Sequence, residues 1–251
     1  MSAAELVAIA AAGFAAGTIN TVVGSGTLIT FPVLLAFGYA PVTANVSNNV
    51  GLVPGSVSGA FGYRRELEGQ RERALRFGTM SVLGGLTGAI LLLALPASAF
   101  EAIVPVFIAV ALILVLIQPW LNARLARHGE PHRGRRGRAL AMGAVYTTGV
   151  YGGYFGAAQG ILLLGILGLA LDQDLHRTNA LKNVLAGSVN GVAALFFIFA
   201  THVDWGPAAV IAGASILGAQ VGARYGRRLP PRALRALIVV VGVTAIVRLL
   251  A

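Results

Sequence analysis

The sequence contains no cysteine, and its 251 residues include a single lysine and nine acidic residues. Without cysteine, disulfides, thiolate metal sites and cysteine nucleophiles are excluded. Charged residues make up only 11% of the chain, whereas 57% of it is hydrophobic. The mean hydropathy of +0.79 lies far outside the range of soluble globular proteins. Because the apolar runs are continuous and do not alternate, the chain is expected to be an all-α polytopic membrane protein.

Long apolar segments recur along the whole chain. A helix needs about 20 residues to cross the hydrocarbon layer. Two stretches, 26–37 and 160–171, have only twelve residues each, and each directly follows a glycine-rich break. They are therefore expected to be half-length helices. The expected helical segments are 4–23, 27–37, 42–63, 77–95, 99–118, 139–157, 160–171, 178–199, 207–223 and 233–250.

Basic residues predict how the segments cross the membrane. Of 19 Lys and Arg residues, 16 fall within 64–76, 124–138 and 224–235. Short basic loops mark the cytoplasmic side, which argues against a nucleic-acid partner. The connections at 96–99 and 200–206 carry no Lys or Arg and are expected on the opposite side. Both termini are then extracytoplasmic. The N-terminus has no basic region before its first apolar segment, so that segment is expected to remain in the mature protein.

The charge pattern also implies that segments 4–37 and 139–171 each return to the side where they began. A helical hairpin satisfies this condition, and so do two full crossings. The short second limbs favour a hairpin that reaches only part of the way across the membrane.

An internal repeat appears at a constant shift of 134 residues. "LGGLTGAILLLALP" at 83–96 aligns with "LGAQVGARYGRRLP" at 217–230, sharing the frame L-G-x3-G-A-x5-L-P. Each repeat would hold one hairpin with a broken helix plus three transmembrane helices. Three crossings are an odd number, so the second copy must be inverted, as in many secondary transporters. The expected organisation is repeat 1 at 1–120, a basic cytoplasmic linker at 121–138 and the inverted repeat 2 at 139–251.

Three stretches resemble the TauE/SafE family of sulfite and organosulfonate exporters. They are "TANVSNNVGLVPGSVSGAFGYRR", "YGGYFGAAQGILLLG" and "RTNALKNVLAGSVNGVAALFF", and the resemblance covers essentially the whole chain. It implies a multi-pass carrier in the bacterial inner membrane. The implied substrates are small anions, often sulfur-containing.

The two breaks are the first candidate substrate site. A helix that begins inside the membrane exposes its first N–H groups and the positive end of its dipole, and both attract anions. An inverted pair of breaks would aim two such ends at one central region. A tight turn between packed helices is the structural alternative. The residues expected to bind substrate here are Gly24, Ser25, Gly26, Thr27, Gln159 and Gly160.

Polar residues of two apolar helices form the second part of the candidate site. Lys182 could supply the counter-charge of an anion, or it could be a snorkelling lysine near a helix end. Asn45 and Asn49 lie one helical turn apart, as do Asn179 and Asn183. They could donate to substrate oxygens or cap the half-helices. The set is completed by Asn48, which the repeat aligns with Lys182.

Three functions are compatible with this pattern to different degrees. A carrier for small anions working by alternating access fits best, and sequence alone does not separate it from an anion channel. An intramembrane enzyme is disfavoured, because no H-E-x-x-H motif or membrane-embedded His/Asp set is present. The four histidines fall in loops without metal-ligand spacing, so no metal or cofactor is expected. Membrane lipid is an expected partner, and homo-oligomerisation stays open.

Overall fold

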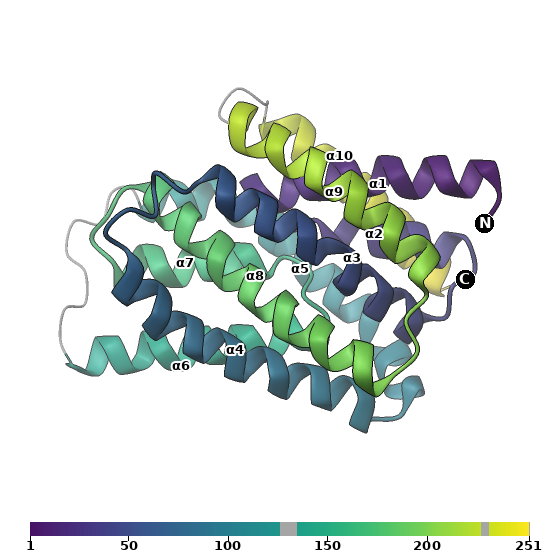
Figure 1. Cartoon of the computed structure of the whole chain (residues 1–251), viewed down its shortest axis with the longest axis horizontal. Helices are drawn as coiled ribbons and strands as arrows, with labels where there is room; N and C mark the ends of the chain where they lie inside the picture. Colours follow the sequence, from purple (N-terminus) through teal and green to yellow (C-terminus); the bar gives the residue numbers. More distant parts are fainter. Residues whose placement is uncertain (126–134, 227–230, 251) are drawn as a thin grey trace.

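The computed structural model describes residues 1–125, 135–226 and 231–250, and these residues form helices and connecting turns. Figure 1 shows the helices stacked side by side. Their bounds are α1 Ala3–Val22, α2 Thr27–Ala36, α3 Pro41–Gly62, α4 Arg71–Ala94, α5 Ala97–Leu125, α6 Arg135–Tyr154, α7 Gln159–Ala170, α8 Leu175–Ala200, α9 Trp205–Tyr225 and α10 Pro231–Leu250.

The helices confirm the class predicted from the sequence. Each of the ten expected apolar segments coincides with one helix. Among the described residues, five helices are long and apolar enough to cross a membrane: α1, α4, α5, α8 and α9. Helices α2 and α7 are short and apolar, as predicted from the twelve-residue stretches. Helices α5 and α6 extend into the expected linker at 121–138, of which residues 126–134 lie outside the described part of the chain.

Polar caps define where several helices begin. Ser2 and Glu5 form a capping box at α1, in which each side chain binds the backbone N–H of the other residue. Asp174 accepts from two N–H groups in the first turn of α8, and Asp204 accepts from Gly206 at the start of α9. These carboxylates satisfy N–H groups that have no partner within the helix. Glu5, Asp174 and Asp204 therefore act at helix starts.

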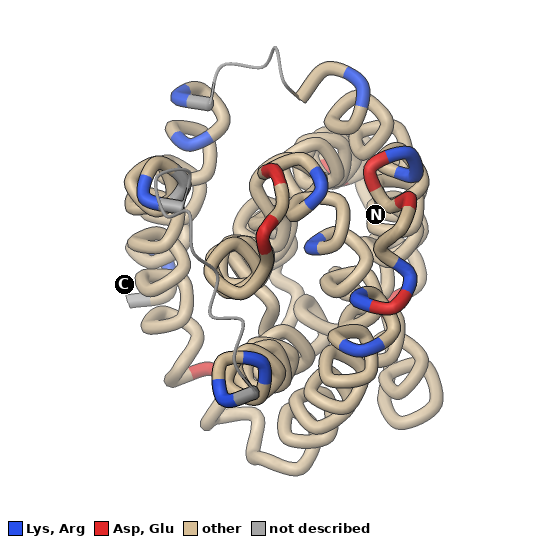
Figure 2. Tube along the Cα trace, turned by 90° about the vertical axis from the view of Figure 1, so that its left-hand side faces the viewer, with Lys and Arg blue, Asp and Glu red and all other residues tan. Residues whose placement is uncertain are grey.

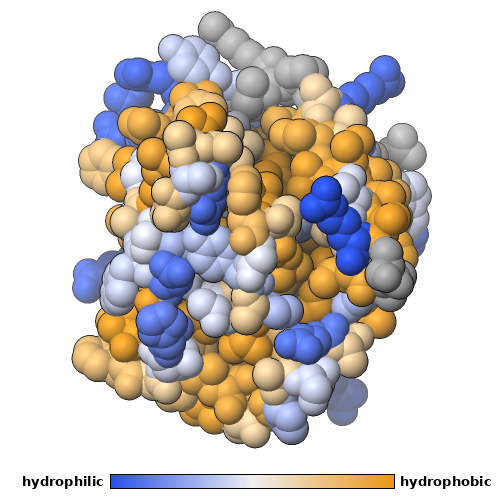
Figure 3. All heavy atoms as spheres, turned by 90° about the vertical axis from the view of Figure 1, so that its right-hand side faces the viewer, coloured by the Kyte–Doolittle hydropathy of each residue, from blue (hydrophilic) through white to orange (hydrophobic). Residues whose placement is uncertain are grey.

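The charged residues divide the molecule into two ends. Figure 2 shows one end, where Lys and Arg gather around the connections α3–α4 and α7–α8. Helix α1 begins and α10 ends at the opposite end (Figure 1), where hydrophilic residues are scattered among hydrophobic ones (Figure 3). We call these the basic end and the terminal end. The start of α1 and the end of α10 thus lie away from the connections α3–α4 and α7–α8. Which end faces the cytoplasm stays a prediction.

Several helices of each half of the chain pack against helices of the other half. Helix α1 packs against α9, and α6 packs against α4; likewise α3 packs against α9, and α8 against α4. The half-helix α2 contacts α10, while α7 contacts α5. Helices α3, α4 and α5 begin 134 residues before α8, α9 and α10, respectively. This packing between the halves supports the interpretation of two repeats, and their inverted relation stays a prediction.

Closely spaced glycines allow the backbones of these helices to touch. A Cβ atom placed on Gly88 of α4 would lie 2.0 Å from the carbonyl oxygen of Val150 in α6. The equivalent Gly222 of α9 has the Thr18 carbonyl oxygen of α1 at 2.7 Å from such a Cβ. Gly84 and Gly218 make similarly close backbone contacts, so the pairs Gly84-x3-Gly88 and Gly218-x3-Gly222 serve tight helix packing.

Replacing Gly88 by alanine should weaken the contact between α4 and α6. The added methyl group would overlap backbone, which cannot move aside without shifting a helix, so we expect a loss of about 2 kcal/mol in the free energy of unfolding. Gly78 on the same helix has no atom within 4 Å of the corresponding position. Gly78→Ala should therefore be neutral or slightly stabilising. Thermal unfolding in detergent compares the two variants, and equal losses would contradict this packing.

Candidate functional site

Two interrupted helices form the centre of the molecule. Helix α1 ends at Val22, the chain turns through Gly24 with a φ of +90°, and α2 begins at Thr27. Helix α6 ends at Tyr154, and the chain turns through residues with positive φ before α7 begins at Gln159. Both breaks lie where the sequence predicted them. Glycine is needed at the first because a positive φ is costly for residues with a Cβ atom.

The two breaks are in direct contact. The Gly160 N–H donates to the carbonyl oxygen of Gly24 at 3.1 Å, and a Cβ atom on Gly24 would lie 2.5 Å from the Cα of Gly160. The Gln159 N–H donates to the carbonyl oxygen of Gly156, and the Gly26 N–H donates to the side-chain oxygen of Asn20. The two helix starts thus meet as predicted, but they close on each other. An anion held between them would have to replace the Gly160–Gly24 hydrogen bond.

Polar side chains at the breaks are buried without a hydrogen-bond partner. Ser25 is 1% exposed and Gln159 is 3% exposed. The hydroxyl of Ser25 and the side-chain nitrogen of Gln159 have no partner in the described part of the chain. Gln159 packs directly over Gly152 of α6. Because an unsatisfied buried polar atom costs about 1–3 kcal/mol, these two groups mark a place where polar contacts are incomplete in this conformation.

Lys182 is completely buried, with 0% of its surface exposed. Its ammonium donates to the carbonyl oxygens of Asn20 at 3.2 Å and Thr21 at 3.4 Å. These carbonyls belong to the last turn of α1, where the helix dipole is negative and stabilises a cation. The snorkelling alternative is therefore wrong for this structure. The lysine faces a helix C-terminus rather than the helix starts at the breaks.

Asn179 and Asn183 join the lysine at the end of α1. Their side-chain amides donate to the Thr21 carbonyl oxygen at 3.2 and 3.3 Å. The side-chain oxygen of Asn179 has no partner among the described residues. Three donors from α8 therefore converge on the last carbonyls of α1, and one acceptor of this cluster is unused. We call Asn179, Lys182 and Asn183 with these carbonyls the α8 cluster.

The asparagines of α3 contact α6 and α2. Asn45 donates to the carbonyl oxygen of Tyr154, the last residue of α6, at 2.9 Å. Asn48 accepts from the Thr30 hydroxyl and donates to the Thr27 hydroxyl at 3.5 Å, so it holds the first turns of α2. Asn49 is buried, and its side-chain oxygen has no described partner. Asn45 thus donates to a carbonyl oxygen at the end of α6, and Asn179 donates to one at the end of α1, so each acts on the opposite repeat. Asn48 instead supports the half-helix α2 of its own repeat.

A cavity at the basic end reaches the α8 cluster. Its volume is about 200 Å³, several times the roughly 30 Å³ that one water molecule occupies in the liquid. Asn179 and Gln118 line it, and both are more than 90% buried. The other lining residues come from helix ends and from α5 and α7: Val22, Val23, Tyr63, Pro119, Leu164, Leu175, His176, Gly226 and Arg235.

Sequence reasoning missed most of this cavity. Gln118 is the last residue of the expected segment 99–118, and His176 is one of the four histidines expected in loops. His176 lies three residues before Asn179, so the two share a face of α8. That spacing was a usable signal. Nothing in the local sequence indicated that Gln118 and Arg235, from two other helices, face the same space.

On the other side of the breaks, aromatic rings pack tightly. Phe31 of α2 lies edge-on to Phe155, with ring centroids 5.2 Å apart, and also edge-on to Phe100 of α5. Phe107 of α5 stacks on Phe155 and contacts Tyr151 of α6. Such pairs add about 0.5–1.5 kcal/mol beyond simple burial. The end of α6 is therefore enclosed by rings, whereas the end of α1 adjoins polar groups and a cavity.

Comparison with known proteins places these features in a family. Residues 9–249 match the family model described as sulfite exporter TauE/SafE. A probable membrane transporter protein, ORF9, from Sinorhizobium sp. is 30% identical over 96% of this chain and 90% of its own. YfcA, a probable membrane transporter protein of Escherichia coli K12, is 28% identical over 94% and 86%, respectively. No solved structure matches. With a model that spans nearly the whole chain, this membrane protein belongs to the sulfite exporter TauE/SafE family of transporters.

Proposed function

We propose that the protein carries small anions, sulfite or organosulfonates among them, across the bacterial inner membrane by alternating access. The family description names sulfite export, and the relatives are named as probable membrane transporters. The anionic substrate itself is inferred from the charges of the site. Under this proposal the basic end is cytoplasmic and both termini are periplasmic.

The observation that carries the proposal is the cavity that leads from the basic end to the α8 cluster. Arg235, His176 and Asn179 line it. Asn179 shares its acceptor, the Thr21 carbonyl oxygen, with the buried Lys182. A positive entrance attracts anions and repels cations. Lys182 is the one buried Lys or Arg among the described residues, and buried charges in membrane helices are costly and are usually functional.

An anion that reaches Lys182 would compete with the carbonyls of Asn20 and Thr21 for the ammonium. Binding would partly release the end of α1 from α8, because it would withdraw Lys182, one of the three donors of the α8 cluster that hold it. Helix α1 packs on α9 and contacts α2. Its release is therefore a direct way to couple anion binding to movement of a hairpin, which alternating access requires.

Flux through the purified protein in proteoliposomes tests the proposal. Sulfite, organosulfonates, sulfate and carboxylates would be offered in turn. We expect saturable uptake of one class that is accelerated by the same anion on the opposite side of the membrane. A linear flux without counter-transport would instead favour a channel. No flux of any anion offered, from protein shown to be folded, would contradict anion transport.

The cavity can be tested by placing a negative charge in it. Asn179→Asp should lower the apparent affinity for the transported anion by about tenfold or more, because a carboxylate would face the entering charge. Asn190→Asp is the matched control: it is another buried asparagine of α8, and it does not line this cavity. Concentration dependence of uptake is the measurement. An equal loss of apparent affinity in both variants would mean that any carboxylate introduced into α8 has this effect, whether or not it lines the cavity.

A further inference from the structure

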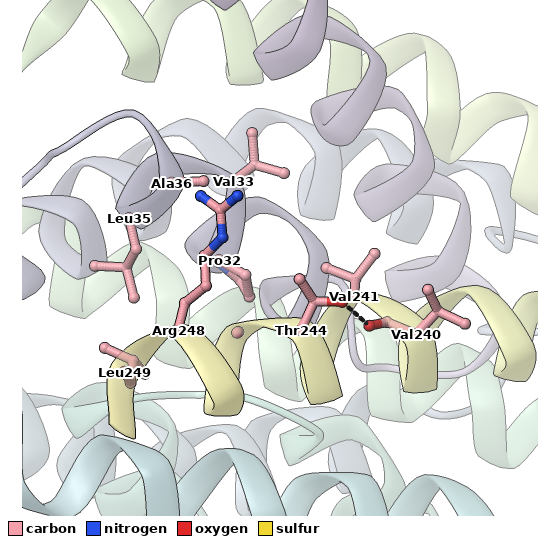
Figure 4. Close-up of a pocket in the computed structure, with 10 residues that line it drawn as sticks. Pro32, Val33, Leu35, Ala36, Val240, Val241, Thr244, Arg248 and Leu249 are labelled. Carbon is pink, nitrogen blue, oxygen red and sulfur yellow. Dashed lines mark hydrogen bonds between the residues drawn. The ribbon is translucent and has the colours of Figure 1, made fainter. Parts of the chain in front are cut away.

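We infer that the groove between α2 and α10 binds an anionic phospholipid, with its phosphate on Arg248 and an acyl chain along the groove. The groove has a volume of about 410 Å³. It lies at the terminal end, away from the cavity that adjoins the α8 cluster. Figure 4 shows Arg248 extending from α10 across the groove towards Val33 and Ala36 of α2.

The walls of the groove fit a hydrocarbon chain. One wall is formed by Pro32, Val33, Leu35 and Ala36 of α2. The other is formed by Val240, Val241, Thr244, Ala245, Arg248 and Leu249 of α10. The hydroxyl of Thr244, a polar group in the α10 wall, donates to the Val240 carbonyl oxygen at 2.8 Å and is thereby satisfied. A small hydrated anion would gain little from these walls. An acyl chain would bury apolar surface against both helices.

Arg248 supplies the charge that selects the headgroup. It is exposed, and it makes no hydrogen bond or ion pair within the described part of the chain. The acidic residues near the start of α1 and α9 are engaged elsewhere: Glu5 binds Tyr39 and Ser2, and Asp204 caps α9. An arginine binds a phosphate through two parallel hydrogen bonds. Arg248 lies in the last turn of α10, which the sequence predicts to be a membrane segment, and the end of such a segment lies at headgroup depth.

The same arginine is unusual in its position. The other described Lys and Arg residues lie towards the basic end or, for Lys182, within the protein. A lone arginine at the terminal end, beside an apolar groove that opens between two helices, is complementary to one anionic lipid. It does not resemble the dense basic clusters that attract a whole anionic surface.

The expected binding has a structural consequence for α2. Residues Pro32–Ala36 form the last part of the half-helix that begins at the first break. A lipid chain in the groove would contact this half-helix directly. Lipid binding at Arg248 would then favour the position of α2 seen here.

Native mass spectrometry of the detergent-purified protein, titrated with phosphatidylglycerol or phosphatidylcholine, tests the inference. The wild type should retain phosphatidylglycerol in preference to phosphatidylcholine. Arg248→Gln should weaken that retention by about tenfold, as expected for the loss of a charge-assisted hydrogen bond. Thr244→Trp, which fills the groove from its exposed side, should weaken retention of both lipids.

Arg136→Gln is the matched control, because it removes an exposed arginine at the start of α6, at the basic end. It should leave retention unchanged. Equal retention of the two lipids by the wild type, or unchanged retention in Arg248→Gln, would overturn the inference. A dimer that dissociates in Thr244→Trp would also overturn it, since the occupant would then be a second copy of the chain. None of these outcomes depends on transport activity.

Discussion

Replacing Lys182 by asparagine is expected to abolish high-affinity anion binding, with a loss of about 100-fold or more. Removal of one partner from a buried charged contact costs about 2–5 kcal/mol of binding free energy. Asparagine is the residue that the repeat places at the equivalent position, Asn48, so the substitution is compatible with this type of helix. Isothermal titration or a ligand-induced shift of the unfolding temperature would measure the loss.

The fold should survive this change. The Thr21 carbonyl oxygen keeps its donors Asn179 and Asn183, and a buried ammonium is itself costly to desolvate. Arg177→Gln is the matched control, because it removes one positive charge from the same helix at a residue that binds the Glu68 carbonyl oxygen. Wild-type affinity in Lys182→Asn would remove the lysine from the binding site. Equal losses in both variants would point to the net charge of the protein.

Replacing Gly24 by alanine is expected to cost about 3 kcal/mol or more in the free energy of unfolding. Two penalties combine at this residue: a φ of +90°, and a Cβ atom only 2.5 Å from the Cα of Gly160. Strain of the first kind and overpacking of the second each cost about 1–3 kcal/mol. Denaturation in detergent, followed by helical circular dichroism, would measure the loss.

The variant Gly38→Ala is the matched control, because it measures the cost of the positive φ without the steric overlap. The φ of Gly38, +86°, is nearly the same, but nothing lies within 4 Å of a Cβ atom placed there. Gly38→Ala should therefore lose only about 1–2 kcal/mol, the cost of the left-handed conformation. Should Gly24→Ala fail to give monodisperse protein while Gly38→Ala succeeds, the contact between the breaks is again supported. Equal stability of the two variants would show that this contact contributes little.

Much of the fold could be predicted from the sequence because membrane helices are specified by local properties. Apolar length sets which segments can span, and glycine marks where a helix stops. The half-helices at 27–37 and 160–171 were predicted in this way and correspond to α2 and α7. Basic residues at segment ends predicted that both termini lie on the side opposite the basic loops, and Figure 1 shows the start of α1 and the end of α10 at the same end of the molecule.

The detailed contacts of the candidate site were less predictable, because backbone groups form much of it. Lys182 stood out as the only lysine, but its partners are carbonyl oxygens of Asn20 and Thr21, which every residue type carries. Their availability depends on where α1 ends and on how α8 packs across it. The contact between Gly24 and Gly160 likewise involves main-chain atoms alone.

The side-chain amides of Asn45 and Asn179 form hydrogen bonds between the two halves of the chain, because each donates to a carbonyl oxygen at the end of a helix in the other half. The Tyr154 carbonyl receives its donor from a residue 109 positions earlier, and the Thr21 carbonyl from one 158 positions later. During synthesis, the end of α1 therefore lacks this donor until α8 has been inserted. A chain of half the length would lack these donors, and a second copy of the same chain could supply them. If the protein arose by duplication, its single-repeat ancestor is expected to have worked as a dimer, and the predicted inversion of the repeats would make that dimer antiparallel.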